Sequence, residues 1–184
     1  MKAADLALYR AKANGKNQAC FFDATMTREL VRRREIEAEL RLALQRDELS
    51  IFFQPIVDLE TGRIRTFEAL VRWFHPEKGE LKPDEFIPVA EESGVIVALG
   101  NWSTAQAARA AAQGPAEVTR AVNLPPLQIK APGAAVGIRT ALNEAQLDPA
   151  LRELELTESL VPEDLPVVTS FGDVVCKVWG HLSR

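Results

Sequence analysis

Hydrophobic and polar residues alternate most clearly over residues 66–73, TFEALVRW, and this alternation predicts a buried β-strand. One face of this strand carries the charged side chains Glu68 and Arg72, which lie about 13 Å apart at ~3.3 Å per residue. That separation excludes a direct salt bridge, so each charge must either meet another group or remain in solvent. The opposite face is wholly apolar and is expected to pack; it consists of Phe67, Ala69, Val71 and Trp73.

Residues 49–59 and 63–73 read as two strands joined by the short polar segment 60–62, ETG. A connection of this length permits only antiparallel pairing, because a parallel crossover needs a dozen or more residues. The large aromatic side chains here are expected to pack in the core rather than to stack on bases. They are Phe52, Phe53, Phe67 and Trp73, with Trp102 further along the chain.

Predicted helices and strands alternate further along the chain. The helices cover residues 83–94, 95–112 and 134–145, and the strands cover residues 118–124 and 151–157. A hairpin followed by this alternation predicts an α/β fold with a mostly parallel sheet in which one strand is reversed. No helical period follows Glu158, so we expect no crossover after it; residues 166–168 and 174–178 are alternatives for one more strand.

The N-terminal part predicts two helices and a short strand. Residues 3–13 and 25–46 have helical patterns, and residues 19–22 read as a strand between them. In the second helix, charged residues surround one apolar stripe, so we interpret it as a linker helix with a solvated polar face, including Arg32, Arg33 and Arg34. The stripe consists of Ile36, Leu40, Ala43 and Leu44.

The composition excludes some classes of function but does not identify one. The 184 residues are 47% hydrophobic and 26% charged, which is ordinary for a globular protein, and the net charge of −4 argues against a general nucleic-acid binder. No apolar run reaches the ~18 residues of a membrane span, and no signal-peptide core follows Met1, so a cytoplasmic location is expected. Cys20 and Cys176 form no paired motif and are expected to be reduced.

Four motifs in fixed order resemble those of EAL domains, the family of cyclic di-GMP phosphodiesterases. The first joins residues 54–56, QPI, to residues 68–73, EALVRW. The others are residues 84–94, DEFIPVAEESG; residues 122–124, VNL; and residues 154–159, LELTES. The resemblance covers about residues 36–160 and implies a modified TIM-like barrel whose first strand is antiparallel.

The length predicts an incomplete barrel of this type. A TIM barrel takes about 250 residues and seldom fewer than about 200, whereas fewer than 140 follow Arg46. The sequence after Leu160 does not resemble the family, so we expect a chain truncated or frameshifted within the domain. Our predicted boundaries are a linker helix at 24–46, the N-terminal half of an EAL domain at 47–160 and a non-family tail at 161–184.

Three oxygen-bearing residues lie near the C-terminal ends of different predicted strands, where barrel enzymes keep their active sites. Glu68, Asn123 and Glu158 could bind Mg²⁺ or Mn²⁺, which prefer such ligands. On pattern alone, Asn123 could instead cap a turn and Glu158 could end a strand in solvent. By the resemblance, these three match metal ligands, and Gln54, Leu70 and Arg72 match substrate-contacting positions.

Departures from the family pattern bear on activity. Pro125-Pro126 follows Asn123 where the family usually has a serine. The adjacent aspartates of the fifth strand are not found, because Thr169 and Ser170 precede Phe171-Gly172 and this segment lies too close to Glu158. The downstream lysine and glutamate of the family have no matching positions, so we expect this chain not to hydrolyse cyclic di-GMP.

Residues 1–23 resemble the last helix and turn of a GGDEF (diguanylate cyclase) domain, through residues 4–12, ADLALYRAK, and 15–17, GKN. So short a remnant cannot carry cyclase activity.

Three hypotheses follow for the chain: half of a cyclic di-GMP phosphodiesterase, a degenerate EAL module that binds the nucleotide or a protein partner, or a non-functional fragment. An exposed barrel edge would suit a homodimer.

Overall fold

The computed structural model describes residues 21–113, 119–146, 152–156 and 181–183, together with residues 4, 7, 8, 19, 169 and 171. Most of the predicted helix at 3–13, most of the tail after residue 157, and Glu158 lie outside the residues that can be described. The elements in chain order are α2 (Ala24–Ala43), β1 (Leu49–Val57), β2 (Ile64–His75), β3 (Gly79–Leu81), α3 (Pro83–Ser93), α4 (Ile96–Gln113), β4 (Thr119–Leu124), α5 (Pro126–Lys130), α6 (Ala134–Glu144), β5 (Arg152–Leu156) and β6 (His181–Ser183).

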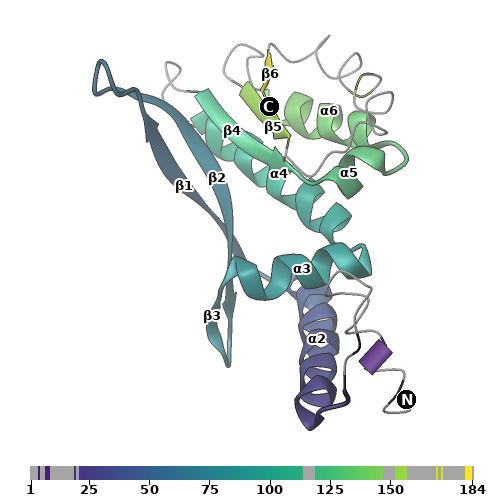
Figure 1. Cartoon of the computed structure of the whole chain (residues 1–184). Coiled ribbons are helices and arrows are strands. Elements are labelled where there is room, and N and C mark those ends of the chain that lie inside the picture. Colours follow the sequence, from purple (N-terminus) through teal and green to yellow (C-terminus); the bar gives the residue numbers. More distant parts are fainter. Residues whose placement is uncertain are drawn as a thin grey trace.

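One six-stranded mixed sheet organises the structure (Figure 1). Its order is β1-β2-β4-β5-β6, with β3 paired to β2. The β1–β2 pair is antiparallel, whereas β2–β4, β4–β5 and β5–β6 are parallel. The predicted α/β class, the reversed first strand and the alternation of helices and strands are therefore confirmed.

The turn between β1 and β2 forms because Asp58 holds it together. Its Oδ1 accepts hydrogen bonds from the backbone N–H groups of Glu60 and Thr61, at 3.1 and 2.8 Å. Gly62 then takes a φ of +66°, a conformation that side chains with a Cβ rarely adopt. The resulting register places Gln54 opposite Glu68 and Phe52 opposite Leu70.

Two groups of buried residues form the core. One lies between the sheet and helices α4 and α6, around Leu124, Ile138 and Leu142. The other joins α2, α3 and the start of α4 to the sheet, where the rings of Trp73 and Phe86 meet edge to face at 5.6 Å. The predicted packing face of residues 67–73 is confirmed, because it contributes to both groups.

Helix α2 begins at its N-cap Asp23, whose side chain accepts a hydrogen bond from the backbone N–H of Thr25. Its predicted stripe is confirmed, since Ile36, Leu40 and Ala43 are buried. The opposite polar surface is not simply solvated as expected. Arg32 pairs with Glu85, and Arg33 contacts Glu92 at 2.6 Å, so two of the three consecutive arginines bind α3.

Several other expectations are wrong. Residues 21 and 22 are not in a strand: the Phe21 side chain is 90% exposed, and the chain turns at once into α2. Phe52 is 52% exposed rather than buried, because consecutive residues of a strand point to opposite faces and Phe53 occupies the packed face.

Short elements were also missed. These are β3, α5 and β6, of three to five residues each. The parallel pairing of β6 with β5 contradicts our expectation that no crossover follows Glu158, because parallel neighbours require one.

Candidate functional site

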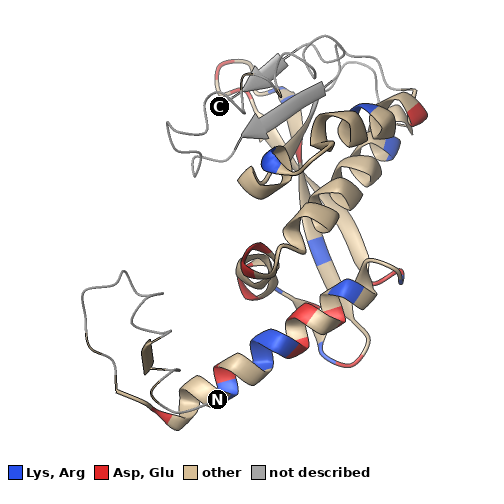
Figure 2. Ribbon diagram, turned by 90° about the vertical axis from the view of Figure 1, so that its right-hand side faces the viewer, with Lys and Arg blue, Asp and Glu red and all other residues tan. Residues whose placement is uncertain are grey.

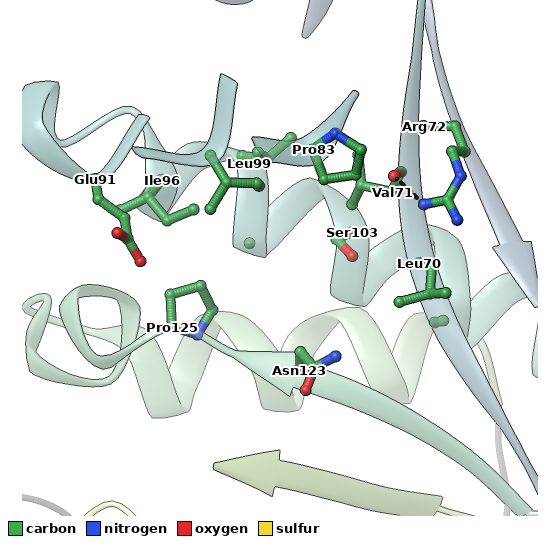
Figure 3. A pocket seen from close by; sticks show the side chains of 13 residues that line it. Leu70, Val71, Arg72, Pro83, Glu91, Ile96, Leu99, Ser103, Asn123 and Pro125 are labelled. Carbon is green, nitrogen blue, oxygen red and sulfur yellow. Dashed lines mark hydrogen bonds between the residues drawn. The ribbon is translucent and has the colours of Figure 1, made fainter. Parts of the chain in front are cut away.

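A pocket of about 340 Å³ opens where β2 and β4 end, beside helices α3 and α4 (Figure 3). Its position follows from the parallel pairing of β2 with β4, which brings the C-terminal ends of both strands to the same edge. The lining residues come from β2, α3, α4 and the end of β4. They are Ala69, Leu70, Val71, Arg72, Pro83, Ile87, Glu91, Ile96, Leu99, Gly100, Ser103, Asn123 and Pro125.

Glu68 and Asn123 meet across the two parallel strands. Because Glu68 is in register with Ala121, Asn123 stands two residues further along the neighbouring strand and on the same face. Its Nδ2 donates a hydrogen bond of 2.7 Å to Glu68 Oε1. The side chain of Asn123 therefore contacts the predicted partner rather than capping the turn that follows.

Arg72 lies at the opposite side of the pocket from Glu91 (Figure 3). Its Nη1 donates a hydrogen bond of 2.9 Å to the carbonyl oxygen of Val71, and its guanidinium lies 5.9 Å from the centre of the Phe52 ring. Its Nε is 3.8 Å from Glu80 Oε1. Glu68 and Arg72 thus have separate partners, as their spacing predicted.

Apolar side chains form the walls of the pocket between Arg72 and Glu91. Leu70 comes from the sheet, Ile96 and Leu99 from α4, and Pro125 from the segment after β4 (Figure 3). A pocket with apolar walls and a cation at one end suits an apolar ring system that carries a negative group.

The structure unites four of the six predicted site residues at this edge: Glu68, Leu70, Arg72 and Asn123. Gln54 is opposite Glu68 in the β1–β2 register but is exposed and does not line the pocket. Glu158 lies outside the described residues.

The contribution of α3 to the pocket was missed, although the sequence contains a signal for it. Pro83, Ile87 and Glu91 follow one another at intervals of four, which places them on one face of a helix. Glu80, which approaches Arg72, was also missed, because β3 was not predicted.

Carboxyl groups with lowered pKa values lie away from the pocket lining. The pKa of Asp58 is lowered mainly by hydrogen bonds from Thr61, and the pKa of Glu85 is lowered first by the backbone N–H of Lys82 and then by Arg32.

Within the described part of the chain, no group of three or more His, Cys, Asp or Glu residues could hold a metal ion. The helices that can be described include none long and apolar enough to cross a membrane.

Comparison with known proteins gives one consistent family. The family model of the EAL domain matches residues 37–178. The bifunctional diguanylate cyclase/cyclic di-GMP phosphodiesterase MucR of Pseudomonas aeruginosa is 38% identical over 165 residues, which are 88% of this chain and 24% of MucR. The cyclic di-GMP phosphodiesterase PdeR of Escherichia coli is 34% identical over 185 residues, 97% of this chain and 28% of PdeR.

Solved structures that resemble this chain point to the same family. The PaMucR phosphodiesterase in complex with c-di-GMP matches with a TM-score of 0.69 and 34% identity, over 76% of this chain and 60% of that one. The FimX EAL domain from Pseudomonas aeruginosa, bound to c-di-GMP, matches with a TM-score of 0.71 at 22% identity, over 81% of this chain and 60% of that one, which shows the fold. The chain spans less than a third of these two curated relatives, MucR and PdeR.

Proposed function

This chain belongs to the EAL domain family, and from that premise we propose that it carries the nucleotide-binding half of a cyclic di-GMP phosphodiesterase site. The whole protein would hydrolyse cyclic di-GMP to linear pGpG, as a member of the cyclic di-GMP signalling system. Two relatives, MucR and PdeR, are described as cyclic di-GMP phosphodiesterases, and a similar solved structure holds c-di-GMP.

The observation that carries this proposal is the position of Arg72 at the mouth of an apolar pocket. A guanidinium can form two parallel hydrogen bonds to a phosphate, and these are about twice as strong as bonds between neutral groups. The apolar walls, including Leu70 and Leu99, suit the faces of a guanine ring. The half-buried Arg72, with 25% of its side chain exposed, can reach a ligand without crossing a layer of protein.

The sheet edge where β2 and β4 meet also carries the predicted metal ligands Glu68 and Asn123. We propose that the carboxylate of Glu68 and the amide oxygen of Asn123 bind Mg²⁺ or Mn²⁺ together with Glu158. Without the ion, Asn123 Nδ2 faces Glu68 Oε1, so the amide would have to turn its Oδ1 toward the metal. Such an ion, when bound, would neutralise phosphate charge and lower the pKa of a water molecule. The 2.7 Å hydrogen bond shows that the two side chains are near enough to share one ligand.

We propose that these 184 residues bind cyclic di-GMP without turnover. Two carboxylates and one amide can hold a single metal ion weakly, and a second ion requires further ligands. The sequence after Glu158 contains no adjacent aspartates, which the family pattern requires on the fifth strand. Residues 1–23 would then be the end of a diguanylate cyclase domain, in keeping with the bifunctional relative MucR.

A non-catalytic module with a protein partner is the second candidate. Strand β1 forms one edge of the described sheet, and Phe52 and Ile56 on it are exposed. An open edge of this kind favours pairing between two copies of the chain. Binding of nucleotide by a monomer would favour the first proposal, whereas dimerisation without nucleotide binding would favour the second.

The test is calorimetric titration of cyclic di-GMP into the purified chain with Mg²⁺, for wild type, Arg72→Ala and the control Arg63→Ala. We expect Arg72→Ala to weaken binding about 10- to 100-fold, since a charge-assisted hydrogen bond contributes about 1.5–3 kcal/mol and 1.4 kcal/mol is tenfold in Kd. Arg63, at the far end of β2 in the hairpin turn, should be dispensable.

Equal affinity of wild type and Arg72→Ala, or no binding by the folded wild-type chain, would contradict the proposal. The same samples, analysed chromatographically for pGpG, should contain none. Release of pGpG that disappears in Glu68→Ala would show that the chain does hydrolyse its ligand.

A further inference from the structure

The surroundings of Arg72 include a negative charge that a phosphate ligand would also face. The Arg72 side chain is 25% exposed, and its Nε lies 3.8 Å from Glu80 Oε1. This separation makes an ion pair but is too long for a hydrogen bond. Nη1 is already bound to the carbonyl oxygen of Val71, so the guanidinium is positioned by its own strand and remains only loosely held by Glu80.

Glu80 reaches this position because of the short strand β3. The chain turns after His75, Gly79 takes a φ of +73°, and β3 returns alongside β2 with Glu80 opposite Phe74. Phe74 in turn contacts the ring of Phe52, above which Arg72 lies. Glu80 therefore stands at the outer side of Arg72, with 53% of its side chain exposed, and does not line the pocket.

We propose that Glu80 is a positioning residue that regulates how strongly Arg72 attracts a phosphate group. This inference rests on the proposed function, in which Arg72 binds the phosphodiester of cyclic di-GMP. In the free chain, Glu80 offsets the charge of Arg72. When a phosphate binds, the carboxylate must move away or face a second negative group, and either event weakens binding.

The charge argument predicts the sign of the effect. Removing the carboxylate of Glu80 leaves a guanidinium with more uncompensated positive charge, so an anionic ligand should bind more tightly. Because both groups are partly exposed, the effect should be moderate and should shrink as salt screens the charges. A merely structural role of Glu80 would produce no such dependence on salt.

The experiment compares wild type, Glu80→Gln and the control Glu77→Gln in titrations with cyclic di-GMP and Mg²⁺ at low and high NaCl concentration. Glu77 is an exposed acid in the adjacent turn, and its described contact is a hydrogen bond from its backbone N–H to His75 Nδ1. Both variants therefore change the net charge equally, but only one removes the group beside Arg72.

We expect Glu80→Gln to bind about 3- to 10-fold more tightly at low salt, with this advantage lost at high salt, and Glu77→Gln to match wild type. Equal affinities of Glu80→Gln and wild type, or weaker binding by Glu80→Gln, would overturn the inference and leave the proposed function standing. An equal gain in both variants would also overturn it, because net charge alone would then suffice. No binding by any of the three would overturn the proposed function, and this inference with it.

Discussion

At the scale of single residues, Glu85 performs two tasks at the beginning of α3. Its Oε1 accepts a hydrogen bond from the backbone N–H of Lys82, which completes the start of the helix, and its Oε2 pairs with Arg32 of α2. Both contacts favour the ionised carboxylate, so its pKa is lowered from the ordinary value of 4.5. A lowered pKa in the folded state means that ionisation stabilises the fold.

We therefore expect Glu85 to make stability dependent on pH in the acid range. Its contribution is present above the unfolded-state pKa and is lost as the pH falls through the lower folded-state pKa. Urea unfolding of wild type should show decreasing stability as the pH falls below about 4.5, and this decrease should be shallower in Glu85→Gln. Glu35→Gln, at an exposed position of α2, should keep the wild-type slope; identical slopes for all three would contradict the prediction.

At the scale of elements, Gly100 allows α4 and α5 to approach each other. A Cβ at this position would lie 2.1 Å from Oε1 and 2.6 Å from Cδ of Gln128. Gln128 is fully buried on the short helix α5, and its Nε2 donates a hydrogen bond of 2.9 Å to Asn101 Oδ1. Its Oε1 has no described hydrogen-bond partner, so the side chain has little freedom to move without losing its remaining bond.

Gly100→Ala should therefore destabilise the chain by about 1–3 kcal/mol, the usual cost of overpacking. Gly137→Ala is a matched control, because a Cβ at that helical glycine would meet nothing within 4 Å, and it should be neutral or stabilising by up to about 1 kcal/mol. In thermal unfolding, Gly100→Ala should cost less in a Gln128→Ala background. An undiminished cost there would show that Gln128 is not the obstacle.

Element boundaries show how far the sequence alone could lead. The helix at Pro83 and its end at Gly94 were predictable, because proline favours a first turn and Gly94 has the left-handed φ of +76°. The strands β3 and β6 contain three residues each, too few for an alternation to stand out. Helix α5 was hidden by Pro125-Pro126, which suggests a break but in fact forms its N-cap and first position.

The candidate site was only partly predictable for a related reason. The separation of Glu68 and Arg72 along one strand is fixed by strand geometry, so it could be calculated. The contact between Glu68 and Asn123 depends on the register of β2 with β4, which the sequence does not state. The pairing of Arg72 with Glu80 depends on β3, and Phe52 is exposed because adjacent phenylalanines on a strand point to opposite faces.

At the scale of the whole molecule, α2 is attached to the rest through charged as well as apolar contacts. Figure 2 shows basic and acidic residues close together along this helix. Beyond its pairs with α3, Glu39 of α2 accepts hydrogen bonds of 2.8 and 2.6 Å from Lys78 Nζ, in the turn between β2 and β3. His75 Nε2 lies 3.6 Å from the same carboxylate.

We expect Glu39 and Lys78 to be energetically coupled. A double-mutant cycle with Glu39→Ala, Lys78→Ala and the double variant should give a coupling energy of about 0.5–1 kcal/mol, because both side chains are partly exposed. Chemical unfolding at low salt measures it, and high salt should reduce it. Strictly additive effects at low salt would mean that the Glu39–Lys78 pair does not help to hold α2 against the turn between β2 and β3.

Helix α3 touches α2 through Glu85 and Glu92 and lines the pocket through Pro83, Ile87 and Glu91. Helix α3 therefore links α2 directly to the pocket. If a sensor domain is fused to the N-terminal side of α2, the length of α2 sets the orientation of that sensor relative to the pocket. Each residue inserted into α2 would rotate the attached sensor by about 100° and shift it by about 1.5 Å, and seven residues would nearly restore its original direction.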